Sequence, residues 1–132
     1  MRLRKAGRDM TKPSIVAIDD EVEFIDMIQN YFGLRGYDIS VAIRGAKGIE
    51  LVKEKKPDVV LMDLKMPGID GDEALSLLKS MSPSPKVIFV TAYDDGGKTK
   101  ARLLKMGAYA YFDKPVSSLR DLEEAVNKAA ST

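Results

Sequence analysis

The chain has 132 residues, of which 45% are hydrophobic and 31% are charged, a size and composition typical of one globular domain. It contains no cysteine and no histidine, which excludes disulfides, cysteine nucleophiles, serine–histidine–aspartate triads and histidine-ligated zinc. The 21 basic and 20 acidic side chains leave a formal charge of +1, so the net charge indicates neither a nucleic acid nor an anionic membrane as partner. Any chemistry must therefore use carboxylates, amines and hydroxyls.

The first twelve residues are more basic than the rest of the chain. They carry five basic side chains and one acidic side chain, so the other 120 residues carry a net charge of −3. We expect residues 1–12 to form a disordered tail and residues 13–132 to form the only domain. No apolar run approaches the length of about 20 residues that spans a bilayer, and no signal-peptide segment is visible, so we expect a cytoplasmic protein.

From residue 14 onward, short apolar runs alternate with longer amphipathic segments. The run at 59–62 is continuously apolar, which is typical of a central parallel strand covered on both faces. The expected strands are residues 15–18, 37–41, 59–62, 87–90 and 108–112. The expected helices contain residues 24–32, 48–56, 74–78, 101–106 and 119–129. Five βα units predict an α/β fold, a doubly wound parallel sheet with helices on both faces.

Polar residues follow the ends of these strands. Asp19 and Asp20 follow the first strand, Asp63 the third, Thr91 the fourth and Lys114 the fifth. Ligands of such sheets lie at the carboxyl ends of the strands, so we expect these side chains to converge. Three carboxylates on one rim repel one another unless a hard cation such as Mg²⁺ takes their oxygens. An aspartate beside a metal, an ammonium and a hydroxyl is suited to attack phosphorus, which predicts an aspartyl phosphate.

A set of segments at the strand ends resembles the receiver domain of two-component response regulators, over roughly residues 14–130. The segments are Asp19-Asp20-Glu21, residues 63–71 (Asp-Leu-Lys-Met-Pro-Gly-Ile-Asp-Gly), Thr91-Ala92 and Lys114-Pro115. The resemblance implies a flavodoxin-like receiver fold, with a five-stranded parallel sheet in the order 2-1-3-4-5.

The same resemblance assigns roles to the residues at the strand ends. It implies that Asp63 is the phosphoacceptor, and that Mg²⁺, with Mn²⁺ as an alternative, is bound by the Asp20 and Asp63 carboxylates and the main-chain carbonyl of Lys65. Asp19 would act mainly through a metal-bound water. Lys114 would pair with the phosphoryl group.

The resemblance also implies a switch. Thr91 would bond to a phosphoryl oxygen and move toward the site, the small Ala92 would leave room for that group, and the ring of Tyr111 would turn inward. The Lys114–Pro115 peptide bond is expected to be cis. The readout face would comprise the fourth helix, fifth strand and fifth helix, roughly residues 98–130.

Two further positions, Lys65 and Tyr93, correspond to residues that tune the lifetime of the phosphorylated state in the family. Because both side chains are large, we expect them to hinder the attacking water and to slow autodephosphorylation.

The function implied is a phosphorylation-activated signalling switch. Its phosphodonor would be a sensor histidine kinase or a histidine phosphotransfer protein, and its output an unidentified protein target, with neither nucleic acid nor membrane bound directly. A phosphorylation-dependent homodimer is left open. Such a domain catalyses its own phosphotransfer and dephosphorylation, but it is not expected to turn over a small-molecule substrate.

Other interpretations of the same residues remain to be weighed. A strand-end aspartate is often only a helix N-cap. A phosphatase of the haloacid dehalogenase type needs a second aspartate where this chain has Lys65, and a flavodoxin-like FMN carrier needs a phosphate loop where this chain has three acidic residues. A degenerate receiver that only binds protein would not need the Asp63, Thr91 and Lys114 set.

Overall fold

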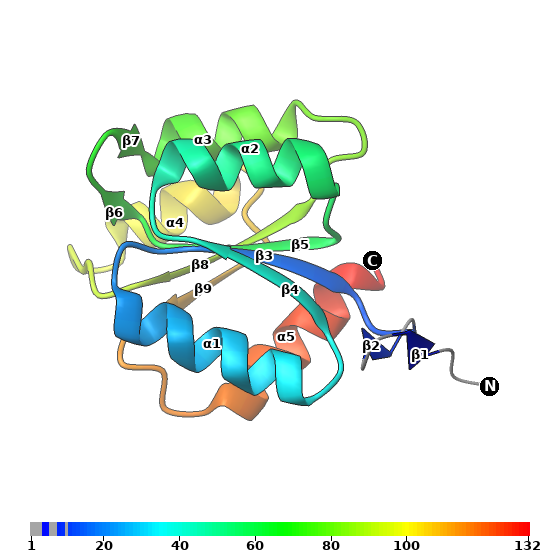
Figure 1. Ribbon diagram of the computed structural model, residues 1–132. Coiled ribbons are helices and arrows are strands. Elements are labelled where there is room, and N and C mark those ends of the chain that lie inside the picture. The colour runs from blue at the N-terminus through cyan, green and yellow to red at the C-terminus, as the bar shows by residue number, and fades with distance from the viewer. Residues whose placement is uncertain (1–3, 6–7, 10) are drawn as a thin grey trace.

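The computed structural model describes residues 4–5, 8–9 and 11–132, and its elements are labelled in Figure 1. Its centre is a parallel sheet of five strands in the order β4-β3-β5-β8-β9. These strands are β3 (Ser14–Ile18), β4 (Asp38–Ala42), β5 (Val59–Met62), β8 (Lys86–Thr91) and β9 (Ala110–Asp113). In chain order this is the predicted arrangement 2-1-3-4-5, and the fold class is confirmed.

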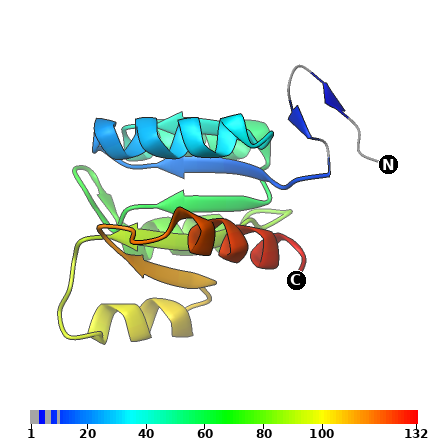
Figure 2. The same cartoon turned by 90° about the horizontal axis from the view of Figure 1, so that it is seen from below.

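Helices cover both faces of the sheet. The helices are α1 (Val22–Leu34), α2 (Gly45–Lys55), α3 (Gly71–Lys79), α4 (Lys98–Lys105) and α5 (Leu119–Ala130). Helices α2, α3 and α4 lie on one face, and α1 and α5 lie on the other, nearer to the viewer in Figure 2. Side chains of a strand point alternately to the two faces, so Val60 and Met62 join one core while Val59 and Leu61 join the other. All four are buried, as predicted for a central strand.

Helix α2 begins three residues before the predicted start at Gly48. Both of its glycines lie against other elements: a Cβ on Gly45 would come within 2.5 Å of Ile69, and a Cβ on Gly48 within 2.5 Å of Ile18. The absence of a side chain at these two positions lets the helix pack closely on the sheet and on β7.

Strand β9 begins two residues later than the predicted strand at 108–112. The main-chain N–H of Ala108 donates to Leu103 at 3.0 Å, so Ala108 belongs to the turn that ends α4. That turn needs the positive φ of 110° at Gly107, a conformation that glycine adopts without strain.

Two small antiparallel ladders lie outside the main sheet. Strand β6 (Lys65–Met66) pairs with β7 (Ile69–Asp70), where the sequence predicted only a turn. Strand β1 (Arg4–Lys5) pairs with β2 (Arg8–Asp9). The predicted disordered tail, residues 1–12, includes residues 1–3, 6–7 and 10, which lie outside the described residues, and the domain boundary stays a prediction. Within the described ranges, no helix is long and apolar enough to cross a membrane.

Candidate functional site

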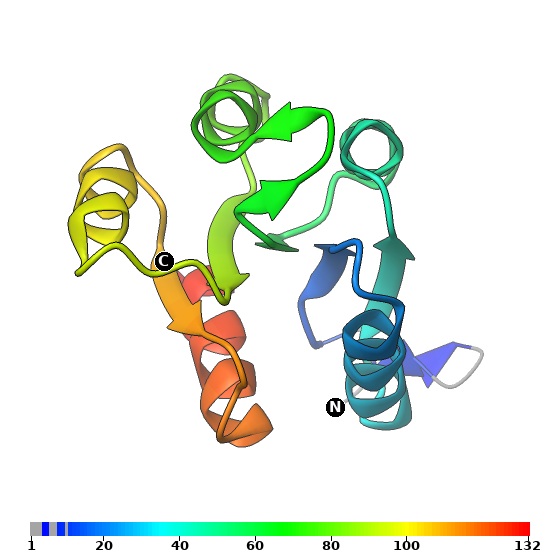
Figure 3. The same ribbon diagram turned by 90° about the vertical axis from the view of Figure 1, so that its left-hand side faces the viewer.

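Three carboxylates meet at the carboxyl ends of β3 and β5, at the edge that faces the viewer in Figure 3. One oxygen each from Asp19, Asp20 and Asp63 lies within 4.8 Å of the other two. The main-chain N–H of Asp63 donates to Ile18, and that of Asp19 donates to Ala42, both at 3.0 Å. These bonds extend the ladders past the strand ends and fix where the aspartates lie. Asp19 and Asp63 are buried, whereas Asp20 is exposed.

The Lys114 ammonium lies among these carboxylates. Its Nζ is 2.7 Å from Oδ2 of Asp19 and 3.7 Å from Oδ2 of Asp63, and it also pairs with Glu21. It lies 4.5 Å from the ring centre of Phe24. The ammonium therefore offsets part of the negative charge of the rim, while its stem is shielded from water. The convergence expected from the strand ends is present, but the contributions of Glu21 and Phe24 were missed.

The main chain around Lys114 is held from the neighbouring strand. The main-chain N–H of Lys114 donates to the carbonyl of Thr91 at 2.9 Å, so the ends of β8 and β9 stay in register. The Lys114–Pro115 peptide bond is cis, as expected.

Burial and charge shift the pKa values of this cluster. Burial raises the pKa of Asp19 above its ordinary value, with hydrogen bonds from Lys114 and from the main chain of Glu21 opposing the shift. For Lys114, burial alone would lower the pKa, but the hydrogen bonds to Asp19 and Glu21 outweigh burial and the pKa is raised. The ammonium stays charged, and Asp19 is a carboxylate whose charge is costly unless a cation offsets it.

The donor set fits a hard divalent cation. Carboxylate oxygens are the ligands that Mg²⁺ and Ca²⁺ prefer, and three of them come from short segments whose main chain is fixed by the sheet. The sequence has no thiolate and no imidazole ligand, which disfavours zinc and other metals that prefer those ligands at this site.

Thr91 and Tyr111 lie in adjacent strands beside the carboxylates. Thr91 is fully buried, and its hydroxyl accepts a hydrogen bond from the main-chain N–H of Tyr93 at 3.2 Å. The half-buried Tyr111 donates its hydroxyl to the main-chain carbonyl of Tyr93 at 3.0 Å. Both residues therefore contact one peptide segment, residues 92–94, in the loop after β8. Burial, followed by the nearby charge of Asp113, raises the pKa of Tyr111.

Lys65 and Tyr93 contact each other next to the site. The Nζ of Lys65 lies 4.4 Å from the ring centre of Tyr93, in a cation–π arrangement. The main-chain N–H of Lys65 points to Oδ1 of Asp63 at 3.4 Å. The two predicted lifetime-tuning side chains thus form one contact, which joins the loops after β5 and β8.

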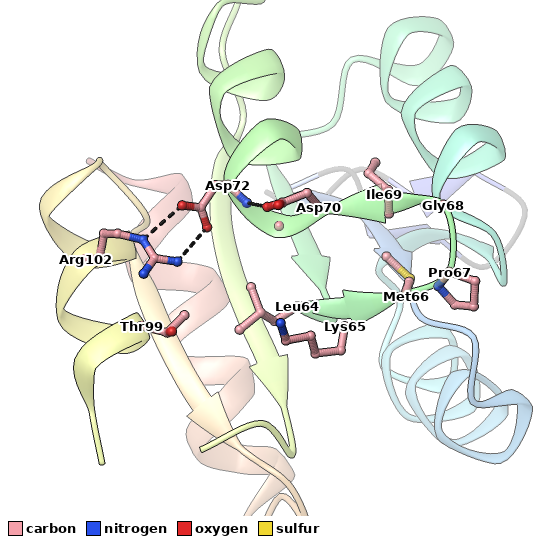
Figure 4. A pocket seen from close by; sticks show the side chains of 11 residues that line it. Leu64, Lys65, Met66, Pro67, Gly68, Ile69, Asp70, Asp72, Thr99 and Arg102 are labelled. Atoms are coloured by element: carbon pink, nitrogen blue, oxygen red, sulfur yellow. Dashed lines mark hydrogen bonds and ion pairs between the residues drawn. The ribbon is translucent and has the colours of Figure 1, made fainter. Parts of the chain in front are cut away.

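A cavity of about 570 Å³ lies between the β6–β7 ladder and α4 (Figure 4). On its rim, Arg102 of α4 makes two hydrogen bonds to the Asp72 carboxylate of α3, at 2.9 and 3.0 Å. Asp72 lies in the first turn of α3, whose N-cap is Asp70. This ion pair ties α4 to α3, and no sequence motif indicated it.

The comparisons with known proteins agree with this architecture. The family model of the response regulator receiver domain matches residues 15–127. The chain belongs to this family. Receiver domains serve phosphorylation-dependent two-component signalling through histidine kinases or phosphotransfer proteins, and the coarse function expected from the sequence is thereby confirmed.

Two curated relatives illustrate how receiver domains are used. The chain is 30% identical over 119 residues to sporulation initiation phosphotransferase F of Bacillus subtilis, covering 90% of this chain and 94% of the relative. It is 36% identical over 110 residues to the regulatory protein AtoC of Escherichia coli, covering 83% of this chain but only 23% of AtoC. The chain thus matches nearly the whole length of the first relative, but less than a quarter of the length of AtoC.

Solved structures of receiver domain proteins are also similar to this chain. A response regulator receiver domain protein from Clostridium thermocellum is 32% identical, with a TM-score of 0.79 and coverage of 89% of this chain and 94% of that one. A CheY-like receiver domain protein from Methanospirillum hungatei is 28% identical, with a TM-score of 0.82 and coverage of 91% and 94%.

Proposed function

We propose that this receiver domain is a phosphorylation-activated switch that accepts a phosphoryl group on Asp63. The observation that carries the proposal is the meeting of the buried Asp63, two further carboxylates and the Lys114 ammonium at one edge of the sheet. Family membership supports the same role. The proposed phosphodonor is a sensor histidine kinase or a histidine phosphotransfer protein, and the proposed compartment is the cytoplasm.

The proposed metal is Mg²⁺, with Mn²⁺ as an alternative. The carboxylates of Asp20 and Asp63 and the main-chain carbonyl of Lys65 would hold it, with Asp19 acting through water. When bound, the metal neutralises negative charge on the phosphoryl oxygens.

In the transfer step, a carboxylate oxygen of Asp63 attacks phosphorus. The bond from phosphorus to the donor breaks, and its electron pair leaves with the donor imidazole or, with acetyl phosphate, with acetate. Lys114, already 3.7 Å from Asp63, pairs with the phosphoryl oxygens and stabilises their charge during transfer. Hydrolysis later breaks the bond between phosphorus and the Asp63 oxygen, and restores the carboxylate with release of inorganic phosphate.

The proposed switch uses the contacts of the loop after β8. In the described state the Thr91 hydroxyl accepts from the N–H of Tyr93, and Tyr111 donates to the carbonyl of the same residue. A phosphoryl group on Asp63 offers the O–H of Thr91 a charged acceptor. When Thr91 turns to it, the Tyr93 segment loses a partner, so the population of the Tyr111 positions and of the face at residues 98–130 shifts.

Intact mass spectrometry tests the phosphoacceptor. The protein is incubated with acetyl phosphate and Mg²⁺, beside Asp63→Asn and beside a magnesium-free sample. We expect one added phosphoryl group on the unmutated protein alone, and only with the metal. An adduct on Asp63→Asn, or no adduct together with no binding of beryllofluoride, would contradict the proposal.

A phosphatase of the haloacid dehalogenase type is the main alternative from another class of protein. It requires a general acid two residues after the nucleophile, and that position is the exposed Lys65. Steady turnover of p-nitrophenyl phosphate, abolished in Asp63→Asn, would favour that alternative.

A further inference from the structure

Lys114 is shared by carboxylates that differ in how deeply they are buried. Its Nζ lies 2.7 Å from Oδ2 of Asp19 and also pairs with Oε1 of Glu21. Oδ2 of Asp63 is 3.7 Å from Nζ, which is too far for a hydrogen bond. The side chains of Asp19 and Asp63 are 2% and 9% exposed, whereas that of Glu21 is 60% exposed. The ammonium that a phosphoryl group on Asp63 would need is therefore held by two other partners, one of which faces the solvent.

The side chain of Glu21 does not stabilise the start of its own helix. Glu21 is the N-cap of α1, and its main-chain carbonyl accepts the first helical hydrogen bond, from Ile25 at 3.0 Å. Its side chain makes no capping hydrogen bond, and glutamate is not among the residues that helices favour at this position. The carboxylate instead reaches Lys114, 93 positions along the chain. A role in the site would account for a glutamate here.

Of its two hydrogen-bonded partners, Lys114 can leave Glu21 at the lower cost. Without Lys114, Asp19 would keep the hydrogen bond from the main-chain N–H of Glu21 at 2.9 Å, but its buried carboxylate would lose the cation that offsets its charge. The Glu21 carboxylate is exposed, so water can replace the ammonium, and exposed ion pairs contribute little to stability. Glu21 is thus the partner that a phosphoryl group can displace.

We propose that Glu21 is a positioning residue that holds the Lys114 ammonium back from Asp63 until a phosphoryl group takes its place. The inference rests on the proposed function, because the competing acceptor is a phosphoryl group on Asp63. Lys114 then keeps Asp19 and exchanges the Glu21 carboxylate for a phosphoryl oxygen. Because Glu21 and the phosphoryl oxygens compete for one ammonium, each weakens the binding of the other. Glu21 therefore limits how readily the domain is phosphorylated.

The alternative role for Glu21 is that of a cation ligand, since it directly follows the two aspartates. In the described part of the chain, however, the carboxylates whose oxygens lie within 4.8 Å of one another at this edge are those of Asp19, Asp20 and Asp63, and Glu21 is not one of them. Its Oε1 is already paired with Lys114. The geometry therefore favours the ammonium over a metal ion as the partner of Glu21.

Three single variants separate the pairing from the charge. Glu21→Gln removes the charge. Glu21→Asp keeps it but shortens the side chain by one methylene, and aspartate is favoured as an N-cap, so its carboxylate turns to the N–H groups of α1. Glu23→Gln is the control, because it removes the charge of an exposed glutamate in the first turn of the same helix.

We expect both Glu21 variants to bind beryllofluoride with Mg²⁺ about threefold more tightly than the unmutated protein, as the loss of an exposed ion pair implies. The initial rate of phosphorylation by acetyl phosphate should rise by a similar factor. The NMR signal of the Lys114 Cε methylene in the metal-free protein gives a readout that needs no metal or phosphoryl group. It should shift in both Glu21 variants, and Glu23→Gln should change none of the three measurements.

Two results would overturn the inference directly. If Glu21→Asp behaves like the unmutated protein while Glu21→Gln is phosphorylated faster, the charge alone explains the rates. If both Glu21 variants are phosphorylated more slowly, Glu21 supports Lys114 rather than holding it back.

A third result would replace the inference. A lower affinity of Glu21→Gln for Mg²⁺ alone, measured by calorimetry, would make Glu21 a cation ligand. If the unmutated protein takes neither beryllofluoride nor a phosphoryl group, the proposed function fails, whereas the Lys114 signal still decides whether Glu21 holds the ammonium.

Discussion

The contact of Lys65 with Tyr93 supports the prediction that autodephosphorylation is slow. The two side chains come from the loops after β5 and β8, and the ammonium lies 4.4 Å from the ring centre. Lys65 lies two residues after Asp63, so we expect this pair to narrow the space through which water would reach a phosphoryl group there. It also holds the two loops together, because each side chain is a partner of the other.

Replacing both residues with alanine is therefore expected to speed autodephosphorylation several-fold. The measurement is the decay of the phosphorylated species by intact mass after removal of the phosphodonor. Lys47→Ala with Tyr109→Ala, which removes an exposed lysine and an exposed tyrosine elsewhere, is the control and should decay at the unmutated rate. An unchanged rate in the Lys65 and Tyr93 double variant would disprove the role.

The aspartates and Lys114 were predictable at this scale because each directly follows a strand. Parallel strands end at one edge, so position in the chain fixes which residues meet there. The pairing of Lys114 with Glu21 and Phe24 was not predictable, since it depends on how a long side chain crosses the rim. Glu21 does directly follow the two aspartates, and that acidic run was the available signal.

At the scale of the elements, one buried carboxylate joins α1 to α5. Glu123 of α5 is 7% exposed and accepts hydrogen bonds from the hydroxyls of Tyr31 and Tyr37, at 2.8 and 2.7 Å, and from Arg35 at 3.0 Å. Asn127 donates to the Tyr37 hydroxyl. Burial, with the hydrogen bond to Glu123, raises the pKa of Tyr37 to about 12. The two helices that cover one face are thus fixed to each other by a polar contact.

Glu123→Gln is expected to lower the free energy of unfolding by about 2 kcal/mol near neutral pH, because hydrogen bonds to a charged acceptor are lost. Burial alone would raise the pKa of Glu123, but the bonds from Arg35, Tyr37 and Tyr31 outweigh it and lower the pKa below its ordinary 4.5. The carboxylate therefore stabilises the fold above pH 4.5, and this contribution is lost as the pH falls through the lowered pKa.

Urea unfolding of the two proteins at a series of pH values measures this difference. The gap between them should close as the pH falls below 4.5. Glu124→Gln, an exposed neighbour on the same helix, should match the unmutated protein throughout. A gap that is constant with pH would show that the loss is one of packing rather than of charge.

Which elements form was clearer from sequence than where they begin. Apolar runs such as 59–62 and 87–90 are buried on both sides of the sheet, and their continuous apolar sequence was enough to predict strands there. The early start of α2 and the β6–β7 ladder were missed, because both depend on contacts between segments: Gly45 against Ile69 in one case, and backbone pairing across Pro67 and Gly68 in the other.

At the scale of the whole molecule, the carboxylates that the site requires lower the stability of the fold. The sheet brings Asp19, Asp20 and Asp63 close together, and among the described residues the Lys114 ammonium is the cation that pairs with them. The observed strand order makes this unavoidable, because β3 and β5, whose carboxyl ends carry these aspartates, are neighbours in the sheet. We therefore expect the metal-free domain to be less stable than its core alone would make it.

Asp20→Asn tests this trade-off, because Asp20 is exposed and its amide keeps the size of the side chain. Without metal, the variant should be more stable by about 0.5 kcal/mol or less, since one repelling but exposed charge is gone. With Mg²⁺ at 100 times its dissociation constant, the unmutated domain should gain about 2.7 kcal/mol, and the variant much less because a ligand is lost. Chemical unfolding with and without Mg²⁺ measures both effects.

Asp26→Asn, which removes an exposed charge from α1, is the control and should change neither value. Equal gains from Mg²⁺ in the Asp20 variant and the unmutated domain would place the cation elsewhere.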